Sequence, residues 1–319
     1  MKRRVIVGGL VAFVAAAGAG AATAEPLTYP AKVVTLVTHS SPGGGSDVFL
    51  REMSKYLGKY INATFIVENV QGGSGAKAIA RVATAPADGS VFYATTPTYI
   101  YTSLMSKPQY SYRDLEPLVN VFADSEVIYT RAESPFKTLQ DVIEHAKKTR
   151  GRWGAANPAS LERQAAEQLK KAAGVNAAIV THEGGGDMML NVLNGTLDIG
   201  IGEIAELRSQ LDAKKVRLLA TFNPKRIDAY PDVPTVEESG FKVSVVKFRG
   251  LAGPKGAPDA VTAVWDKAVA ALLQDPDYKK VYEQDVLSPN LVTHDKYPTF
   301  VNGFADTTSQ FLRETGAIK

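Results

Sequence analysis

Two glycine-rich loops, residues 41–47 (SPGGGSD) and 182–187 (HEGGGD), are the segments of this sequence best suited to chemistry. Each follows a short β-branched run and precedes an amphipathic helical stretch. Glycines let backbone N–H groups approach a ligand closely, and the helix that follows adds unpaired N–H groups and the positive end of its dipole. Two such loops in one chain predict two anion sites that grip one small carboxylate or phosphate from both sides.

Polar residues in and near these loops could either hold the loops or contact the solute. Asp47 and Asp187 would repel an anionic solute, so we expect both to cap their loops by holding backbone amides. His182 is either a hydrogen-bond donor to the solute or an ordinary surface or core histidine. Arg249 either grips a second carboxylate through its fork of donors or is an exposed strand charge.

Enzyme chemistry has little support in the sequence. The first loop lacks the Gly-Lys-Ser/Thr ending of a P-loop, no GxSxG elbow occurs, and the four histidines show no metal-ligand spacing. The best enzyme alternative is a serine hydrolase that uses Ser41 or Ser46 with His39, but no third group that would complete a catalytic triad is evident. We therefore expect a binding protein with no catalytic residue, no metal and no cofactor.

The first 24 residues predict a cleaved secretory signal. Lys2, Arg3 and Arg4 precede an uncharged segment, residues 5–22, that ends in small residues. A membrane anchor is the alternative, but the strongly apolar part, residues 5–17, is shorter than the roughly 20 residues that a span needs. The chain has no cysteine, and its formal charge of +3 equals the three signal charges. These features predict a periplasmic protein without disulfides and argue against a nucleic-acid partner.

Strands and helices alternate along the remaining chain, which predicts α/β layers. A chain of 319 residues exceeds the usual single core, so we expect two lobes. Lobe 1 is predicted to comprise residues 25–122 and 249–319, and lobe 2 residues 123–248, with two hinge crossings near 121–123 and 246–248. A long strand at 241–251 is expected to make the return crossing, and Thr138 with Asp141 to begin a helix of lobe 2.

The order and spacing of several short motifs resemble the Bug-type periplasmic solute receptors of tripartite tricarboxylate transporters. The resemblance covers essentially the whole mature chain and is carried by residues 29–30, 41–47, 67–69, 72–75, 88–89, 195–198, 216–220, 226, 231–235, 238–240, 250–251 and 254. It implies a two-lobed periplasmic binding protein of the Venus flytrap type II class, in which each lobe has a mixed, mostly parallel sheet flanked by helices.

The resemblance also implies where the solute binds. In the first lobe, residues 41–47 match the family's leading carboxylate-binding turn, and residues 95–98 are expected to contact the solute through their hydroxyl groups. In the second lobe, residues 157–160 and 181–187 match the two loops that face the solute. His182 and Glu183 depart from the usual tyrosine and lysine, so the ligand's identity does not carry over. The predicted ligand-binding residues are Ser41, Gly43, Gly44, Gly45, Ser46, Thr95, Thr96, Asn157, Ser160, His182, Gly184, Gly185 and Arg249.

The predicted function is capture of a small organic carboxylate, an aliphatic or aromatic dicarboxylate, between the lobes. The expected partners are this solute and, transiently, the subunits of a tripartite tricarboxylate-type membrane transporter, with the receptor acting as a monomer. A receptor that signals to a sensor kinase would use the same cleft and remains an alternative.

Overall fold

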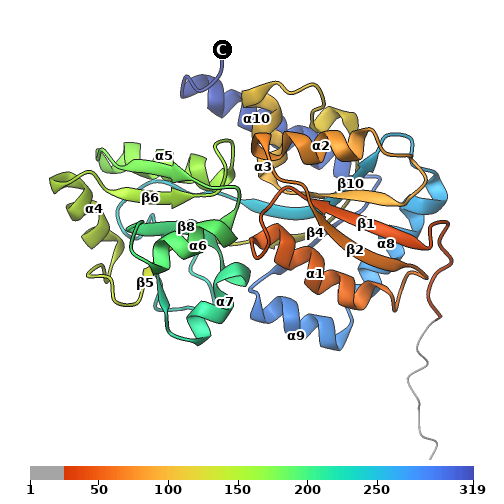
Figure 1. Ribbon diagram of the computed structural model, residues 1–319, viewed down its shortest axis with the longest axis horizontal. Coiled ribbons are helices and arrows are strands. Elements are labelled where there is room, and N and C mark those ends of the chain that lie inside the picture. The colour runs from red at the N-terminus through yellow and green to blue at the C-terminus, as the bar shows by residue number, and fades with distance from the viewer. Residues whose placement is uncertain (1–24) are drawn as a thin grey trace, which may run out of the picture.

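The computed structural model describes residues 25–319, and the predicted signal, residues 1–24, lies outside them. Two sheets, one of six strands and one of five, lie side by side and each carries its own helices (Figure 1). The predicted two-lobed α/β architecture is confirmed. None of the helices in residues 25–319 combines the length and apolar character needed to cross a membrane.

Lobe 1 is built on the sheet with strand order β11-β4-β10-β3-β1-β2. Its parallel part pairs β1 with β2 and with β3, and its antiparallel part pairs β10 with β3 and β4, and β4 with β11. Its strands are β1 (Val33–Thr38), β2 (Thr64–Asn69), β3 (Val91–Thr95), β4 (Leu115–Asp124), β10 (Lys247–Pro254) and β11 (Ser288–Val292). Its helices are α1 (Gly45–Leu57), α2 (Ala76–Ala83), α3 (Pro97–Ser106), α8 (Asp259–Leu272), α9 (Pro276–Gln284) and α10 (Tyr297–Glu314).

Lobe 2 is built on the sheet with strand order β7-β6-β8-β5-β9. Strand β6 runs parallel to β7 and β8, whereas β5 runs antiparallel to β8 and β9. Its strands are β5 (Glu126–Arg131), β6 (Arg152–Ala155), β7 (Ala178–Thr181), β8 (Ile199–Glu203) and β9 (Val216–Thr221), and its helices are α4 (Leu139–Lys148), α5 (Leu161–Ala173), α6 (Gly185–Leu193) and α7 (Ile204–Asp212). Helix α4 begins at the predicted Thr138 cap, whose hydroxyl accepts from the N–H of Asp141 at 3.2 Å.

The chain changes sheets at two adjacent places. It leaves the six-stranded sheet at the end of β4, Asp124, and enters the five-stranded sheet at Glu126. It returns at Lys247, which pairs with Asp124 in the antiparallel β4–β10 ladder. These points lie within a few residues of the predicted lobe boundaries. The two crossings therefore run side by side and can act together as a hinge.

The strand expected at residues 241–251 is displaced toward the C-terminus. Residues 241–246 have no regular structure, and β10 occupies Lys247–Pro254 instead. The valines that suggested an early strand serve lobe 2: Val243 and Val245 are buried in its core, and the N–H of Val245 donates to the carbonyl of Phe222 at 3.2 Å. Burial against lobe 2 thus takes these residues out of the ladder of lobe 1.

Two helices that bear on the site, α3 and α7, were not expected from the sequence. Helix α3 has Thr96 as its N-cap and Pro97 at its first position, an arrangement that favours helix initiation. Helix α7 begins after Glu203 and has a reciprocal capping box between Glu203 and Glu206. Only Ile204 and Leu207 of this helix are buried, three positions apart. An apolar pattern of two residues is too short to predict a helix.

Candidate functional site

Five helices direct their N-terminal ends at the cleft between the lobes. Helices α1 and α6 contribute their first residues, Gly45 and Gly185, and α3 contributes its N-cap, Thr96. Helix α5 contributes Glu162 of its first turn, and α7 contributes Glu203 and Glu206. A helix N-terminus has unpaired N–H groups and the positive end of the dipole. Such a convergence favours negative charge at this place.

The cleft is closed in this structure. The space that remains measures about 20 Å³, enough for about one water molecule. It is lined by His39, Ser40, Gly45, Ser46, Thr96, Thr98, Ala156, Asn157, Glu162, Glu183, Gly184, Gly185, Ile201, Glu203, Glu206 and Lys247. A solute larger than water can enter only if the lobes separate.

The two glycine-rich loops face each other across the cleft, as two opposed anion sites would. A Cβ atom on Gly184 would lie 2.6 Å from the Oγ of Ser41 and 2.7 Å from its backbone nitrogen. A Cβ atom on Gly186 would overlap the carbonyl oxygen of Pro42. The loops therefore pack backbone against backbone, and glycine is required at both positions for the lobes to close.

A carboxylate of the protein itself lies between the loops. The N–H of Gly45 donates to Oε2 of Glu206 at 3.0 Å, and a Cβ atom on Gly185 would overlap the same carboxylate. Glu206 Oε1 accepts from the N–H of Glu203 at 3.3 Å. The side chain from lobe 2 thus occupies the position between two helix N-termini where the sequence predicted a solute anion.

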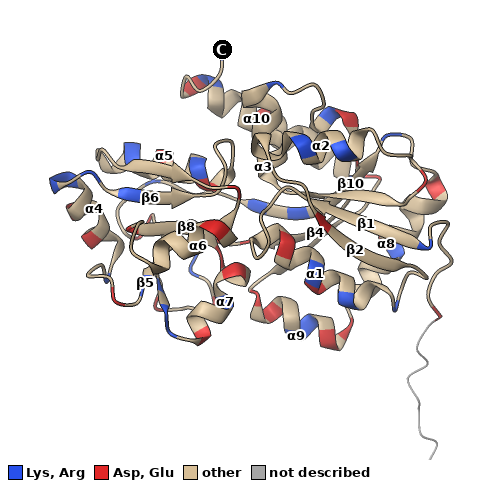
Figure 2. Ribbon diagram, viewed as in Figure 1, with Lys and Arg blue, Asp and Glu red and all other residues tan. Residues whose placement is uncertain are grey.

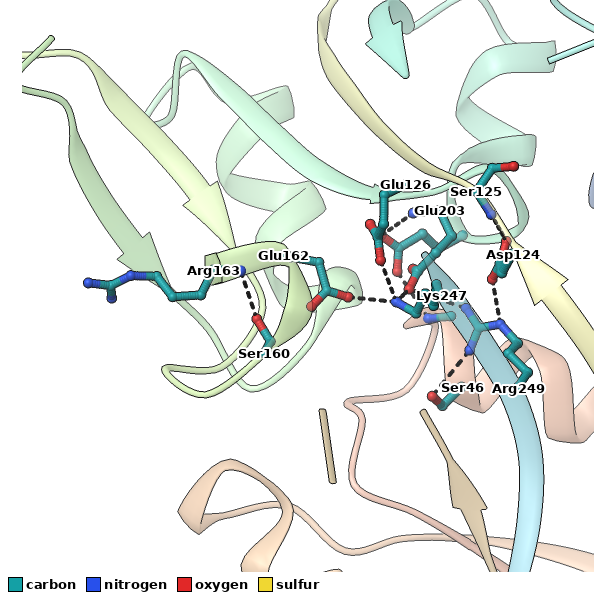
Figure 3. A network of polar contacts seen from close by, with 12 residues as sticks. Ser46, Asp124, Ser125, Glu126, Ser160, Glu162, Arg163, Glu203, Lys247 and Arg249 are labelled. Carbon is teal, nitrogen blue, oxygen red and sulfur yellow. Dashed lines mark hydrogen bonds and ion pairs between the residues drawn. The ribbon is translucent and has the colours of Figure 1, made fainter. Parts of the chain in front are cut away.

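The crossing strand β10 supplies two buried cations, both of them paired (Figure 3). Lys247 Nζ lies 2.7 Å from Glu126 Oε1, 2.7 Å from Glu162 Oε1 and in contact with Glu203. Arg249 Nε lies 2.5 Å from Asp124 Oδ2, Nη2 lies 3.2 Å from Glu203 Oε1, and Nη1 donates to Ser46 Oγ at 3.3 Å. In Figure 2, the basic residues of β10 and the acidic residues of α7 mark the junction between the lobes.

Burial and neighbouring charges shift the pKa values of this network. Burial raises the pKa of Glu126 to about 8, and burial together with the charge of Glu162 raises the pKa of Glu206 to about 8. Glu162 and Lys247 attract each other. Burial opposes the charged form of each, but this attraction lowers the pKa of Glu162 and contributes to the raised pKa of Lys247. Burial therefore favours the protonated form of Glu126 and of Glu206 more than water would.

His39 and Ser46 of the hydrolase alternative are engaged elsewhere, and the Ser41 hydroxyl has no hydrogen-bond partner within residues 25–319. Burial lowers the pKa of His39 to about 4, and its Nδ1 atom lies 2.7 Å from the hydroxyl of Tyr93. Ser46 accepts from Arg249. Neither serine forms a hydrogen bond with His39 within residues 25–319. The arrangement does not provide an activated nucleophile.

Six of the predicted ligand-binding residues line the closed cavity: Gly45, Ser46, Thr96, Asn157, Gly184 and Gly185. Four others support the lining. The N–H of Gly44 donates to the carbonyl of Ser41 at 3.0 Å, Ser41 packs on Gly184, and Thr95 Oγ1 lies 2.6 Å from the Tyr297 hydroxyl. Ser160 caps α5 by accepting from the N–H of Arg163 at 3.0 Å.

The structure places the remaining predicted residues differently. Gly43 is exposed and donates to Asp47 Oδ2 at 2.9 Å, so Asp47 holds this loop. Within residues 25–319, no hydrogen bond joins the Asp187 carboxylate to a backbone amide, which contradicts its expected capping role. His182 lies 3.1 Å from the Asn191 amide rather than in the cavity lining.

Arg249 requires a correction as well. The sequence offered it as a donor to a solute carboxylate or as an exposed strand charge, but it is 1% exposed and bound to Asp124 and Glu203. The exposed-charge alternative is wrong, because the guanidinium is buried and paired with two carboxylates. Its Nη2 atom lies beside Gly45 and has no hydrogen-bond partner within residues 25–319, so the role of donor to a solute stays a prediction. The pairing with Asp124 also makes Arg249 an anchor for the hinge strand.

The acidic half of the site was missed by sequence reasoning. The cavity is lined by Glu162, Glu203, Glu206 and Lys247, of which Lys247 pairs with Glu162 and Glu203. The sequence does hold a pattern that could have indicated Glu203 and Glu206, because their spacing is that of a capping box at the start of a helix. Glu162 follows Ser160, the cap of α5, by two residues, and acidic residues are common in a first helical turn. No local pattern shows that these helix ends meet.

The closed form should lose stability as pH rises toward alkaline values. The folded-state pKa of Glu206 is about 8 and its ordinary value is 4.5, so between these values the folded protein holds a proton that the unfolded chain has released. The resulting stabilisation is complete below the unfolded value and is lost as pH rises through about 8. We expect the Tm to fall between pH 6 and 9, and Glu206→Gln, which mimics the protonated acid, to reduce that fall in thermal scans. An unchanged pH profile in this variant would contradict the assignment.

Comparison with known proteins identifies the family. Residues 49–316 match the family model described as "Tripartite tricarboxylate transporter family receptor". Protein BugT of Bordetella pertussis is 26% identical over 317 residues, which cover 96% of this chain and 95% of BugT. A UPF0065 protein from the ttuE-ttuC' intergenic region of Agrobacterium vitis is 28% identical over 257 residues, which cover 78% of this chain and 73% of that protein.

Solved structures show the same fold. The periplasmic binding protein BugD aligns with a TM-score of 0.83 at 24% identity, covering 89% of this chain and 97% of BugD. An R. palustris protein solved with adipate aligns with a TM-score of 0.83 at 22% identity, covering 89% of this chain and 97% of that protein. The fold is that of a two-lobed periplasmic binding protein, and the family is one of receptors rather than enzymes. This chain belongs to the tripartite tricarboxylate transporter receptor family.

Proposed function

We propose that this protein is a periplasmic receptor that captures a small organic acid in the cleft between its lobes and delivers it, as a monomer, to a tripartite tricarboxylate-type membrane transporter. The observation that carries the proposal is the convergence of five helix N-termini on one enclosed space. Oriented N–H groups and dipole ends bind carboxylates without a metal or a covalent bond.

The position of Glu206 supports a carboxylate as the ligand. Its carboxylate accepts from Gly45 and lies against Gly185, so the closed form already shows how one carboxylate fits between α1 and α6. A solute carboxylate would take the place of Glu206 at the N–H of Gly45, because opening the lobes separates α7 from α1. Two structural neighbours agree with this ligand class: the R. palustris protein was solved with adipate, and MatC from Rhodopseudomonas palustris, which aligns with a TM-score of 0.73, with malate.

Closure of the lobes would report that the solute has bound. A solute that contacts both glycine-rich loops stabilises the closed form over the open one, which shifts the population toward closure. The membrane transporter would then recognise the closed shape. A receptor for a sensor kinase would use the same shift, and no observation in the cleft favours it over transport.

A screen of organic acids tests the proposal. Purified protein without residues 1–24 should gain thermal stability in millimolar mono-, di- or tricarboxylates, because a ligand that binds only the folded state raises the Tm. Hits should be confirmed by isothermal titration calorimetry. Stabilisation by neutral sugars or by inorganic cations, with none by any acid, would contradict the proposal.

A further inference from the structure

We propose that the turn after helix α9, residues 284–287, is a docking element that holds the two lobes together and sets the affinity for the solute from outside the cleft. Asp285 and Val286 are its positioning residues. The inference rests on the proposed function, because it assumes that binding closes the lobes, but it is independent of the solute's identity. It follows from two residues that are unfavourable at their own helix end and have their partners on the other lobe.

Val286 has a backbone conformation that valine rarely adopts. Helix α9 ends in a Schellman motif, in which the N–H of Leu287 donates to the carbonyl of Tyr282 at 2.8 Å and the N–H of Val286 donates to that of Glu283 at 3.1 Å. The motif places Val286 in the left-handed region, with a φ of 58°. Glycine is usual at this position, and a β-branched residue there is strained. The helix end itself therefore does not account for a valine.

The side chain of Val286 packs on the other lobe. It lies against a core cluster of lobe 2 whose buried members include Ile204 and Leu207 of α7 and Ile227. The turn and residues 225–229 of lobe 2 also line one cavity. Apolar burial against lobe 2 thus offsets the strain of the turn, and it does so only while the lobes are together.

Asp285 is also unfavourable at its position in lobe 1. It is the C-cap of α9, and a carboxylate at a helix C-terminus faces the negative end of the dipole. Its side chain is 2% exposed, and burial, together with the charge of Glu52, raises its pKa to about 6. The charge of Arg208 on α7 favours the ionised form, since its Nη1 atom lies 2.7 Å from Oδ1 of Asp285. The ionic partner of this buried carboxylate therefore belongs to lobe 2.

Both contacts are made where α9 and α7 meet at the junction between the lobes (Figure 1). Neither Asp285 nor Val286 lines the solute cavity. Each departs from a local preference, and such departures are typical of functional positions. A contact that forms only in the closed state raises the closed population, and with it the affinity for a solute that closure traps.

Val286→Gly separates docking from the stability of the turn. Glycine relieves the left-handed strain but removes the side chain that packs on lobe 2. We expect the affinity for adipate or succinate, measured by titration calorimetry on the protein without residues 1–24, to fall at least about fivefold. Lys214→Gly is the matched control, because Lys214 has the same place in a Schellman motif after α7, a φ of 54° and an exposed side chain. Its affinity should stay within about twofold of the parent value.

A double-mutant cycle tests the pairing across the lobes. Asp285→Asn and Arg208→Gln should each weaken binding of the same acids at least about fivefold, and the double variant should bind no more weakly than either single one, because both changes remove one contact. Asp277→Asn is the matched control on α9. Asp277 is 61% exposed and pairs with Lys280 of its own helix, so this variant should keep the affinity within about twofold.

The separation of the lobes is measured without any solute. The chain has no cysteine, so spin labels can be attached at Lys148→Cys in lobe 2 and Lys267→Cys in lobe 1, both exposed positions. Double electron–electron resonance then gives the distance distribution between them. We expect a larger open population in Val286→Gly and Asp285→Asn than in the parent, because the docking contact is weakened. Circular dichroism verifies that each variant is folded.

Each outcome has a distinct meaning. If Val286→Gly and Asp285→Asn keep the affinity and the lobe separation of the parent, the inference is wrong and the proposed function stands. If Asp285→Asn weakens binding as strongly with Arg208→Gln as without it, the pairing across the lobes is not what sets the affinity. If no acid binds the parent protein, the proposed function is contradicted, and the distances between the spin labels decide the inference alone.

Discussion

Gly186→Ala is expected to prevent closure and to weaken solute binding by at least about 100-fold, equivalent to about 2.8 kcal/mol. The new methyl group would overlap the Pro42 carbonyl oxygen, and the Gly43 carbonyl carbon and Gly44 nitrogen lie 3.3 Å from its position. These are backbone atoms of the opposite lobe, so no side-chain rotation relieves the overlap. The φ angle of Gly186 is not positive, so alanine fits the backbone of α6 itself.

The lobes of the Gly186→Ala protein should still fold, because the overlap exists only when the lobes meet. Titration calorimetry with the tightest acid from the screen measures the affinity, and small-angle X-ray scattering measures whether the radius of gyration stays large with the solute present. Gly303→Ala is the matched control, since a Cβ atom there meets nothing within 4 Å on α10. The control should bind normally and gain up to about 1 kcal/mol of stability. Normal affinity in Gly186→Ala would show that the loops need not meet.

Lys247→Met is expected to lower the free energy of unfolding by about 3–5 kcal/mol, the range for breaking a buried ion pair from one side. Methionine has nearly the volume of lysine but leaves Glu126, Glu162 and Glu203 without their shared cation. All three glutamates are buried, with exposures of 0%, 6% and 3%. Their mutual repulsion would no longer be offset, and at least one more would have to take up a proton.

Urea denaturation at pH 7 measures this loss against Lys279→Met. Lys279 lies on α9 with 55% of its side chain exposed, 3.7 Å from Glu283, so its replacement should change the free energy of unfolding by less than about 1 kcal/mol. The deficit of Lys247→Met should shrink as pH is lowered, since protonation neutralises the unpaired carboxylates. A loss of under about 1 kcal/mol would mean that the three carboxylates tolerate one another without the lysine.

Closure depends on α7 at more than one point. Besides the contact of Glu206 with Gly45, Arg208 Nη1 of the same helix lies 2.7 Å from Oδ1 of Asp285, which follows α9 of lobe 1. Burial raises the pKa of Asp285 to about 6. Opening the cleft must break both contacts, and a solute carboxylate compensates for the first of them.

The local features of the site could be predicted from the sequence because they depend on neighbouring residues. Gly45 and Gly185 begin helices, Asp47 holds its loop, and Ser160 and Thr138 cap helices, each through groups within about four positions along the chain. Such contacts follow from backbone geometry and short-range hydrogen bonds. Alternation of strands and helices likewise indicated two α/β lobes.

The composition of the site depended on contacts between distant segments. Arg249 is paired with Asp124, 125 positions away, and the N–H of Gly45 donates to the carboxylate of Glu206, 161 positions away. No local pattern indicates which charged residues the fold will bring together. The sequence therefore left Arg249 between a solute carboxylate and an exposed strand position, and it gave no indication that the glutamates meet.

The sequence by itself determined that this chain has two lobes, two glycine-rich turns and helices that begin at those turns, because glycine conformation, capping and periodicity act over a few residues. Only the tertiary structure decided that the turns close on each other, that a carboxylate of α7 lies between them, and that the cations of the hinge strand are already paired. Those outcomes depend on long-range electrostatics and on burial, which arise only when the sheets and helices of both lobes are assembled.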